Sequence, residues 1–567
     1  MRVFLMIFAL STHLFLCKHC LADQPSEKRW LCGNAEKIFT DANFITLDPR
    51  QPRAQAVAVT NGYIVGAGNE QDIIEQCRGD KTELVDLKGA TVIPGFINTY
   101  SRLVMTGWLY DHAFDISSTN PFKQKNWKPI KTLDAFLTFL EKLRPSAGEW
   151  LIVSGYDETK IHGDPLTIEI LNDKKKDAPT IVFYASADKA LLNQAGIDKL
   201  KTKGIQINKN GIVSGRLFNR LLSELIPTPL VEKSIQTAAD FYAGQGYTTV
   251  TEIQGNNAWL RAYDKLTETS KLPVDIIYVS EDLKTKKTLD LLYQDNPRLY
   301  AGPLLIQVDG FPHNYTAFLT HSYKHNHVAE SGDWPGKYLK LSPNLLEQAI
   351  LEAYRHNIPV MVEANGDAAI DLGLNIIQKA ERLFPGQQIP PIFINADFVR
   401  DDQLHRMGKA GIKISFFAPY LHYWGEQLCH EALDPSLVHH MAPFATAKSK
   451  LGKAAAHDSP PMTAPMPLNA LNLMTTRKIQ VWNYPLNQHC PQYFSLAERI
   501  SPQDALEALT INAADLYGLD KEKGSLMVGK LADMTILSAN PLLYSSQEPK
   551  VLGTILRGQL RWAGMKS

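Results

Sequence analysis

The stretch from Val92 to Leu103 constrains the fold more than any other part of this sequence; it reads Val-Ile-Pro-Gly-Phe-Ile-Asn-Thr-Tyr-Ser-Arg-Leu. An apolar run ends at Pro94-Gly95, and a second short apolar run then leads into polar residues. Pro and Gly interrupt regular structure, and a short apolar run bounded by turn signals is typical of a buried strand. The stretch therefore predicts a passage from a small β domain into the first strand of an α/β domain.

Both ends of the chain carry β patterns. Residues 34–93 contain Asn61-Gly62 between two apolar runs, which is a hairpin signal because Asn-Gly accepts positive φ. Residues 520–567 repeat the pattern of short apolar runs separated by turns. We therefore expect one small β-sandwich domain built from both chain ends.

The middle of the chain, residues 94–519, alternates apolar runs with amphipathic helical segments such as 345–351. This alternation predicts an α/β fold, a TIM-type (β/α)8 barrel. A doubly wound open sheet is the alternative, but no Gly-rich phosphate loop follows an early strand. The predicted strands include residues 150–153, 180–183, 274–277, 304–308 and 359–362.

The first 22 residues have the layout of a signal peptide. Arg2 precedes an apolar run over 3–16, and Cys20-Leu21-Ala22 ends in a small residue, so we expect cleavage after Ala22. The run is short for a transmembrane span, and no other stretch is long and apolar enough to cross a bilayer. The sequence thus predicts a periplasmic or secreted protein with no transmembrane anchor after cleavage.

Cysteine usage agrees with export. Four cysteines remain after the signal peptide, and they allow three pairings. We favour Cys32–Cys77, since both lie in the N-terminal β region, together with Cys429–Cys490. Four unpaired buried thiols are the alternative.

Charge excludes two classes of partner. The chain has 59 basic and 59 acidic residues, so it has no electrostatic footprint for nucleic acid or an anionic membrane. We expect a small-molecule ligand or substrate, and the sequence makes no prediction about oligomeric state.

Several ordered motifs over residues 34–563 resemble the amidohydrolase superfamily, in the branch of N-substituted formamide deformylase-like (YtcJ-like) exported hydrolases. The resemblance implies a barrel that holds two divalent metals at its C-terminal mouth and hydrolyses non-peptide carbon–nitrogen bonds. The motifs are Pro94-Gly95-Phe96-Ile97, Asp309-Gly310, Asn365-Gly366-Asp367, Phe398-Val399-Arg400 and Asp458-Ser459-Pro460.

The resemblance also implies a ligand set: a His-x-His pair, a bridging carboxylated Lys, two later His, and an Asp that is both ligand and general base. Such metals lower the pKa of bound water and polarise a carbonyl. Only Asp458 is retained, as the candidate catalytic residue. We therefore expect no metal and no other cofactor, with the ancestral zinc site lost. The replaced positions are, in order, Tyr100, Arg102, Leu305, Glu363 and Asn395.

Arg102 suggests a physical replacement for the metal. An aspartate that loses its metals becomes an unpaired buried charge, which is costly, and a guanidinium neutralises it with a fixed fork of donors. We therefore expect Arg102 to pair with Asp458. Otherwise Arg102 points to solvent or pairs with Asp111 or Asp115.

A rebuilt single-cation site is the rival interpretation. A set of carboxylates with one His could hold a hard or borderline cation. Asp309 and Asp367 could instead be structural acids that accept turn or helix-cap hydrogen bonds. The candidate set is Glu252, Asp309, Glu363, Asn395 and Asp458, with His457 and His313 close by in sequence.

A second histidine cluster, His321, His325 and His327, lies in a polar aperiodic segment, and we interpret it as a solvated loop rather than a metal site. Two functional hypotheses follow. The first is a hydrolase of carbon–nitrogen bonds that uses Asp458 as base with an altered or absent metal. The second is a pseudoenzyme that binds a small molecule or a protein partner without turnover, since function depends on the site and not on the fold.

Overall fold

The computed structural model describes residues 32–564, apart from 123–126, 146–148, 177, 254, 294, 325–333, 337–340, 387–388 and 545–547. The expected signal peptide over 1–22 lies outside the described residues, and so do His325 and His327.

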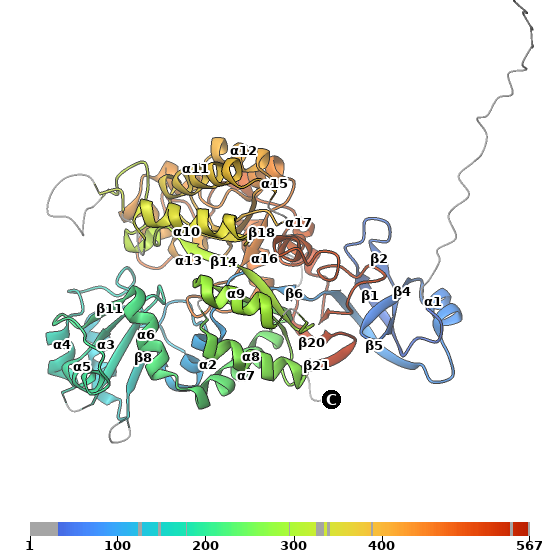
Figure 1. Cartoon of the computed structure of the whole chain (residues 1–567), viewed down its shortest axis with the longest axis horizontal. Helices are drawn as coiled ribbons and strands as arrows, with labels where there is room; N and C mark the ends of the chain where they lie inside the picture. Colours follow the sequence, from blue (N-terminus) through green and yellow to red (C-terminus); the bar gives the residue numbers. More distant parts are fainter. Residues whose placement is uncertain are drawn as a thin grey trace, which may run out of the picture.

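The two chain ends join in one domain, as the β patterns at both ends predict (Figure 1). Its described strands pair into a single mixed sheet, whereas the sequence predicts a sandwich of two sheets. Strands β5 and β19 join the two ends in antiparallel register, with Met534 opposite Pro94. The predicted Asn61-Gly62 hairpin connects β3 and β4, and both residues have positive φ. Helix α1 (Glu70–Cys77) packs on this sheet. The order is β21-β20-β19-β5-β1-β3-β4, with β2 on β1, and the bounds are β1 Lys37–Ile45, β2 Arg53–Ala54, β3 Ala56–Thr60, β4 Tyr63–Gly68, β5 Glu83–Pro94, β19 Met534–Leu537, β20 Val551–Leu556 and β21 Gln559–Ala563.

The middle of the chain forms a curled parallel sheet of eight strands, which confirms the predicted TIM-like barrel. Helices such as α8 (Asn257–Glu268), α10 (Pro343–Arg355) and α11 (Asp367–Leu383) follow individual strands. Parallel strands bring their carboxyl ends to one edge, so the residues just after each strand meet at the barrel mouth. The strands, in sheet order, are β6 Phe96–Ile97, β12 Tyr247–Glu252, β13 Asp275–Ser280, β14 Leu299–Gln307, β15 Val360–Ala364, β16 Ile392–Asn395, β17 Lys413–Phe417 and β18 Ala455–His457.

An apolar cluster fills the inside of this barrel. Leu305, at the position that the family resemblance gives to the bridging Lys, is 2% exposed and belongs to this cluster. Burial of apolar surface stabilises by about 25 cal/mol per Å² removed from water. Leu305 is therefore a core residue. Its neighbours in the cluster include Ile97, Tyr100, Ile253, Ile277, Val279, Met361, Ile392 and Ile394.

A second, five-stranded sheet interrupts the barrel sequence after α2 (Leu103–His112) and lies to one side of it (Figure 1). The apolar runs at 150–153 and 180–183 do form strands, but they lie here and not in the barrel. An apolar run reports burial and does not identify the partner strand. The elements are β7 Phe114–Asp115, α3 Leu133–Lys142, β8 Leu151–Tyr156, α4 Ile168–Lys174, β9 Thr180–Tyr184, β10 Lys189–Leu192, α5 Gln194–Lys201, β11 Ile212–Ser214 and α6 Gly215–Leu225.

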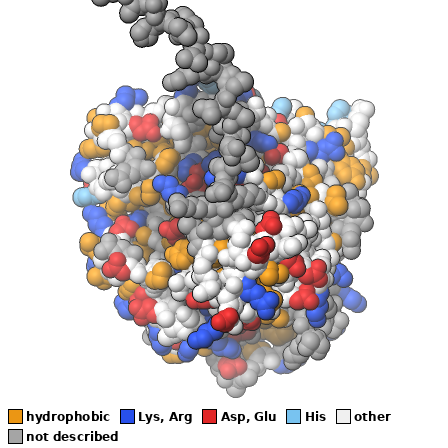
Figure 2. Space-filling view, turned by 90° about the vertical axis from the view of Figure 1, so that its right-hand side faces the viewer, with side chains coloured by type: hydrophobic (Ala, Val, Ile, Leu, Met, Phe, Trp, Pro, Cys, Tyr) orange, Lys and Arg blue, Asp and Glu red, His pale blue; other side chains and the backbone are white. Residues whose placement is uncertain are grey.

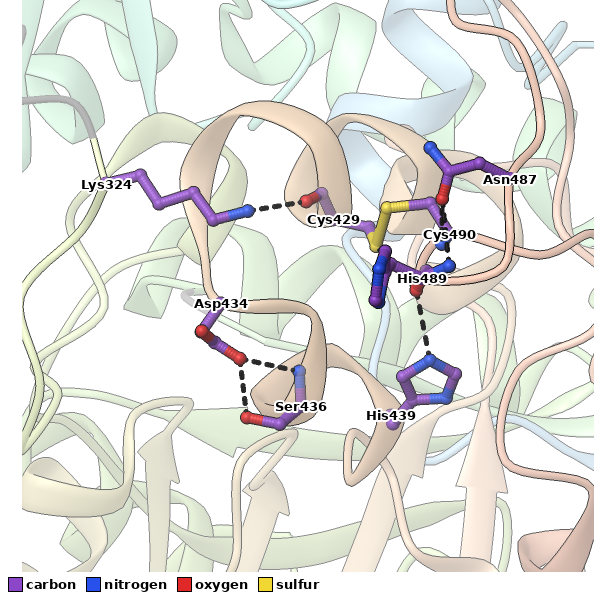
Figure 3. The surroundings of a disulfide bond; sticks show 8 residues. All are labelled: Lys324, Cys429, Asp434, Ser436, His439, Asn487, His489 and Cys490. Atoms are coloured by element: carbon purple, nitrogen blue, oxygen red, sulfur yellow. Dashed lines mark hydrogen bonds between the residues drawn. A yellow bond between two sulfur atoms is a disulfide. The ribbon is translucent and has the colours of Figure 1, made fainter.

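Both favoured disulfides form, so the alternative of four free thiols is wrong. Cys32–Cys77 ties the start of the described chain to the end of α1. Cys429–Cys490 links a helical turn over residues 428–432 to a long loop (Figure 3). Around it, Lys324 Nζ donates to the Cys429 carbonyl at 2.9 Å, and Asn487 Oδ1 accepts from the Cys490 amide at 2.8 Å.

Surface charge is mixed. On the face that Figure 2 shows, Lys and Arg side chains alternate with Asp and Glu side chains, in agreement with the zero net charge. Within the described ranges, every helix is too short or too polar to serve as a membrane span.

Candidate functional site at the barrel mouth

Glu363 lies near the end of β15 and is 2% exposed. Its Oε2 accepts a hydrogen bond from Tyr100 Oη at 2.6 Å and another from Gln307 Nε2, and its Oε1 accepts from Asn395 Nδ2 at 3.2 Å. Strand register positions two of these donors, because Gln307 pairs with Glu363 and Asn395 pairs with the next residue, Ala364. The carboxyl of Glu363 is thus surrounded by three donors.

His457, at the end of β18, extends this arrangement. Asn395 uses Nδ2 to donate to Glu363, so its Oδ1 accepts from His457 Nε2 at 3.1 Å. His457 Nδ1 then accepts from Ser415 Oγ at 3.0 Å. Burial lowers the pKa of His457 to about 3, so the ring is neutral. We call this group the mouth network, defined as Tyr100, Gln307, Glu363, Asn395, Ser415 and His457.

Tyr100 is the donor that crosses the barrel interior. Burial, followed by the nearby Glu363 carboxylate, raises the pKa of the Tyr100 hydroxyl well above its ordinary value. The hydroxyl therefore keeps its proton and donates it to Glu363. Tyr100 also fills space, since its ring lies 5.5 Å from the His457 ring and belongs to the apolar cluster of the barrel.

Asp458 follows β18 directly and is fully buried. Its Oδ2 accepts from Tyr247 Oη at 2.5 Å, and its main-chain carbonyl accepts from Asn98 Nδ2 at 3.3 Å. Burial, and then the charge of Asp458, raise the pKa of Tyr247 well above its ordinary value, so Tyr247 remains a donor.

Arg102 precedes α2 and is 3% exposed, so it does not point to solvent. Its guanidinium carbon lies 5.8 Å from the centre of the Tyr100 ring. The pairing of Arg102 with Asp458 that the sequence predicts stays a prediction. Of its other expected partners, Asp111 pairs with Lys233 and Asp115 accepts from Ser117.

Asp309 and Asp367 are structural acids, as one interpretation of the sequence predicts, but neither caps a helix: Gly366 precedes α11, and no side-chain hydrogen bond caps that end. Asp309 accepts hydrogen bonds from three main-chain amides, those of Phe318, Asn365 and Gly366, each at 2.8 Å. Asp367 accepts from the Thr320 amide at 2.8 Å and pairs with Arg400 at 2.9 Å. Burial raises the pKa of Asp309 to about 7 although these amides oppose the change.

A pocket of about 530 Å³ opens beside the mouth network, at the carboxyl ends of β6, β12 and β13. Glu252 lies at its inner end and is fully buried, with Oε2 accepting from the Val104 amide at 3.0 Å and from the Tyr263 hydroxyl. Burial raises the pKa of Glu252 to about 8. His313 lies elsewhere, stacked on Trp424 with ring centroids 4.9 Å apart.

The residues at the mouth do not fit the two-metal arrangement. Leu305 has no ligand atom, Arg102 is a permanent cation, and Glu363 already accepts three hydrogen bonds. The rival single-cation set is not brought together either: over the part of the chain that the structure describes, no three His, Cys, Asp or Glu side chains are placed to hold one ion. We therefore derive no chemical step through a metal.

Sequence reasoning missed several members of this site: Gln307, Ser415, Tyr247 and Tyr263. Gln307 is the one that a signal could have revealed, because it ends an apolar strand run and so faces the mouth. The tyrosines carry no such signal, since aromatic residues in strands and helices are commonly core residues.

The fold is that of a TIM-barrel protein with a mixed sheet built from both chain ends. A model of the amidohydrolase family matches residues 83–561. The chain belongs to the amidohydrolase family.

Individual relatives are distant. The chain is 22% identical to N-substituted formamide deformylase of Arthrobacter pascens over 568 residues, covering 93% of this chain and 98% of that protein. It is also 22% identical to the protein YtcJ of Bacillus subtilis, covering 90% and 96%. Among solved structures, an uncharacterized metal-dependent hydrolase of Pyrococcus horikoshii matches with a TM-score of 0.70 at 19% identity, covering 89% and 98%, and so supports the fold.

Proposed function

We propose that this protein is an amidohydrolase-fold pseudoenzyme that binds a small molecule at its barrel mouth and no longer hydrolyses carbon–nitrogen bonds with two metals. The observation that carries the proposal is the surrounding of Glu363 by Tyr100, Gln307 and Asn395. Three hydrogen bonds satisfy the acceptor atoms of this carboxyl without a cation. The ring nitrogens of the neutral His457 are satisfied in the same way, by hydrogen bonds to Asn395 and Ser415.

Descent from N-substituted formamide deformylase-like enzymes is part of this proposal. It is supported by similarity along nearly the whole length of that relative and by the order of the motifs. The pocket beside Arg102 and Glu252 is the ligand site that we propose, because its size lies in the range of about 300–1,000 Å³ that is usual for small-molecule sites.

Export to the periplasm or the outside of the cell is also proposed. The signal-peptide pattern of the first 22 residues supports it. The two disulfides support it independently, because disulfides persist in oxidising compartments.

A second candidate is a hydrolase that works with an altered or absent metal and uses Asp458 as base. The retention of Asp458, fully buried at the end of the last barrel strand, favours it. A positioned carboxylate can act as a general base if a substrate places a water or a leaving proton within hydrogen-bond reach.

Turnover of N-substituted formamides by the purified mature protein tests both candidates. We expect no turnover above background, with or without added zinc or manganese. Metal-dependent turnover that Asp458→Asn abolishes would overturn the pseudoenzyme proposal. Turnover that resists a chelator and is lost in Asp458→Asn would establish the second candidate.

A further inference from the structure

The pocket beside the mouth network is built from four separate stretches of the chain. Residues 102 and 105, at the start of α2, and the end of β12 supply its inner end, and the stretch from β12 continues into the first turn of α8. That turn and the start of α9 (Leu283–Leu292) supply one wall, and α6 supplies the other. Its apolar lining includes Met105, Leu222, Ile253 and Trp259. Such a lining with a few polar groups at one end is typical of a site for a small organic ligand.

Glu252 directs a polar atom into this space. Its Oε2 accepts from the Val104 amide and the Tyr263 hydroxyl, whereas its Oε1 has no hydrogen-bond partner among the described residues although the side chain is fully buried. A buried polar atom without a partner costs about 1–3 kcal/mol, so it indicates a missing ligand or water.

The protonation of Glu252 sets what it can bind. Burial raises its pKa to about 8, more than Tyr263, the amides and Arg102 lower it. The carboxyl is therefore mainly protonated near neutral pH. Since Oε2 accepts two hydrogen bonds, the proton belongs on Oε1, which then faces the pocket as a donor.

We propose that this pocket binds a small organic monocarboxylate, with its carboxylate between Glu252 Oε1 and the Arg102 guanidinium and its apolar part against Trp259 and Leu222. The inference rests on the proposed function, because it names the ligand class of the same mouth.

Charge selects a ligand with one carboxylate. The inner end of the pocket offers donors, and Arg102 adds positive charge there. The α9 wall carries Glu281 and Asp282, and Asp282 is already bound to the Thr285 amide at 2.7 Å. A second carboxylate on the α9 side of the pocket would lie against these acids and be repelled. Arg220 of α6 also lines the pocket, and its Nη2 donates to the Gly204 carbonyl at 3.0 Å.

Binding of benzoate and hexanoate by the full mature protein tests the proposal, with benzyl alcohol, hexanol and benzylamine as comparison probes in calorimetry and ligand-observed NMR. We expect both carboxylates to bind and the neutral and cationic probes to bind about 10-fold or more weakly, as loss of a charged hydrogen bond implies. Equal binding of benzoate and benzyl alcohol, or no binding of either carboxylate, would overturn the proposal.

Three variants locate the site. Arg102→Gln should weaken benzoate about 10-fold or more. Leu222→Trp, which fills the pocket from α6 without touching the mouth network, should abolish binding, whereas Leu292→Trp on the exposed surface should leave it unchanged. Unchanged benzoate affinity in a folded Leu222→Trp protein would contradict the assignment even if Arg102→Gln fails to fold.

Raising the pH through about 8 should weaken benzoate binding, because Glu252 then loses its proton and repels the ligand. The tyrosines that face Glu252 keep their protons in this range, because burial raises the pKa values of Tyr242, Tyr263 and Tyr278 well above their ordinary range. Glu252→Gln should remove the pH dependence. If the protein shows no hydrolase activity and also binds no carboxylate, this inference alone is defeated. Metal-dependent turnover would defeat the proposed function.

Discussion

Tyr100 and Glu363 are joined by a hydrogen bond of 2.6 Å between Tyr100 Oη and Glu363 Oε2, although they lie 263 residues apart. In the family resemblance both positions belong to metal-binding histidines. Here one is a donor that keeps its proton and the other an acceptor, so the two ends of β6 and β15 are held together by a direct contact.

Replacing Tyr100 by Phe should destabilise the fold by about 1–3 kcal/mol, since Glu363 loses a donor in a buried site. Urea denaturation measures the change. Tyr110→Phe is the matched control, because Tyr110 is 46% exposed, and it should change stability little. Equal stability of the two variants would show that the mouth network does not stabilise the fold.

Asp275 should be the most sensitive charged residue of the barrel. It is fully buried and binds Lys523 at 2.7 Å, Arg298 at 2.8 Å and Arg557 at 3.1 Å. Asp275→Asn leaves these cations without their shared partner and should cost about 3–5 kcal/mol. Asp295→Asn, at an exposed position, serves as control, and comparable denaturation midpoints would refute the expectation.

Removing the Cys429–Cys490 disulfide by Cys429→Ser with Cys490→Ser should lower stability by about 2–4 kcal/mol, because the bridge closes a loop of 61 residues in the unfolded chain. Thermal unfolding in the presence and absence of reductant measures the loss. The double variant should be insensitive to reductant at this site; if the wild type is no more stable, the bridge does not stabilise the fold.

Stability should fall as the pH rises between about 6.5 and 8. Burial raises the pKa of Glu252 from 4.5 to about 8 and that of Asp309 from 3.8 to about 7, so the folded state binds more protons than the unfolded state in this window. Below about 6.5 the buried His457 and His313 oppose this slope, because burial lowers their pKa values from 6.5 to about 3 and about 4. Asp275 does not add to the slope, because its neighbouring cations outweigh burial and lower its pKa to about 2. Urea midpoints at several pH values measure the slope, and Glu252→Gln should make it shallower. A flat or rising profile would contradict these shifts.

Much of the architecture was predictable because it depends on local pattern. The Pro94-Gly95 junction marks where the end sheet meets the barrel, and the Asn61-Gly62 turn joins two strands of the end sheet. The structural roles of Asp309 and Asp367 as hydrogen-bond acceptors follow from residue type. The two disulfides follow from position and compartment.

Other features depend on contacts that no local pattern records. The strands at 151–156 and 180–184 look like barrel strands, but they pair with β7 and β10 in the second sheet. The bond from Tyr247 to Asp458 joins residues 211 apart, and the surroundings of Arg102 result from packing at the ends of three strands. Strand order and side-chain direction decide these contacts, and both arise only when the sheet closes.

Metal content of the purified mature protein, after incubation with zinc and removal of free ions, tests the central claim most directly. A mouth organised around Glu363, Tyr100 and Asn395 predicts metal well below one ion per chain, with unchanged thermal stability after chelation. Two zinc ions per chain, released together with a loss of stability on chelation, would contradict it.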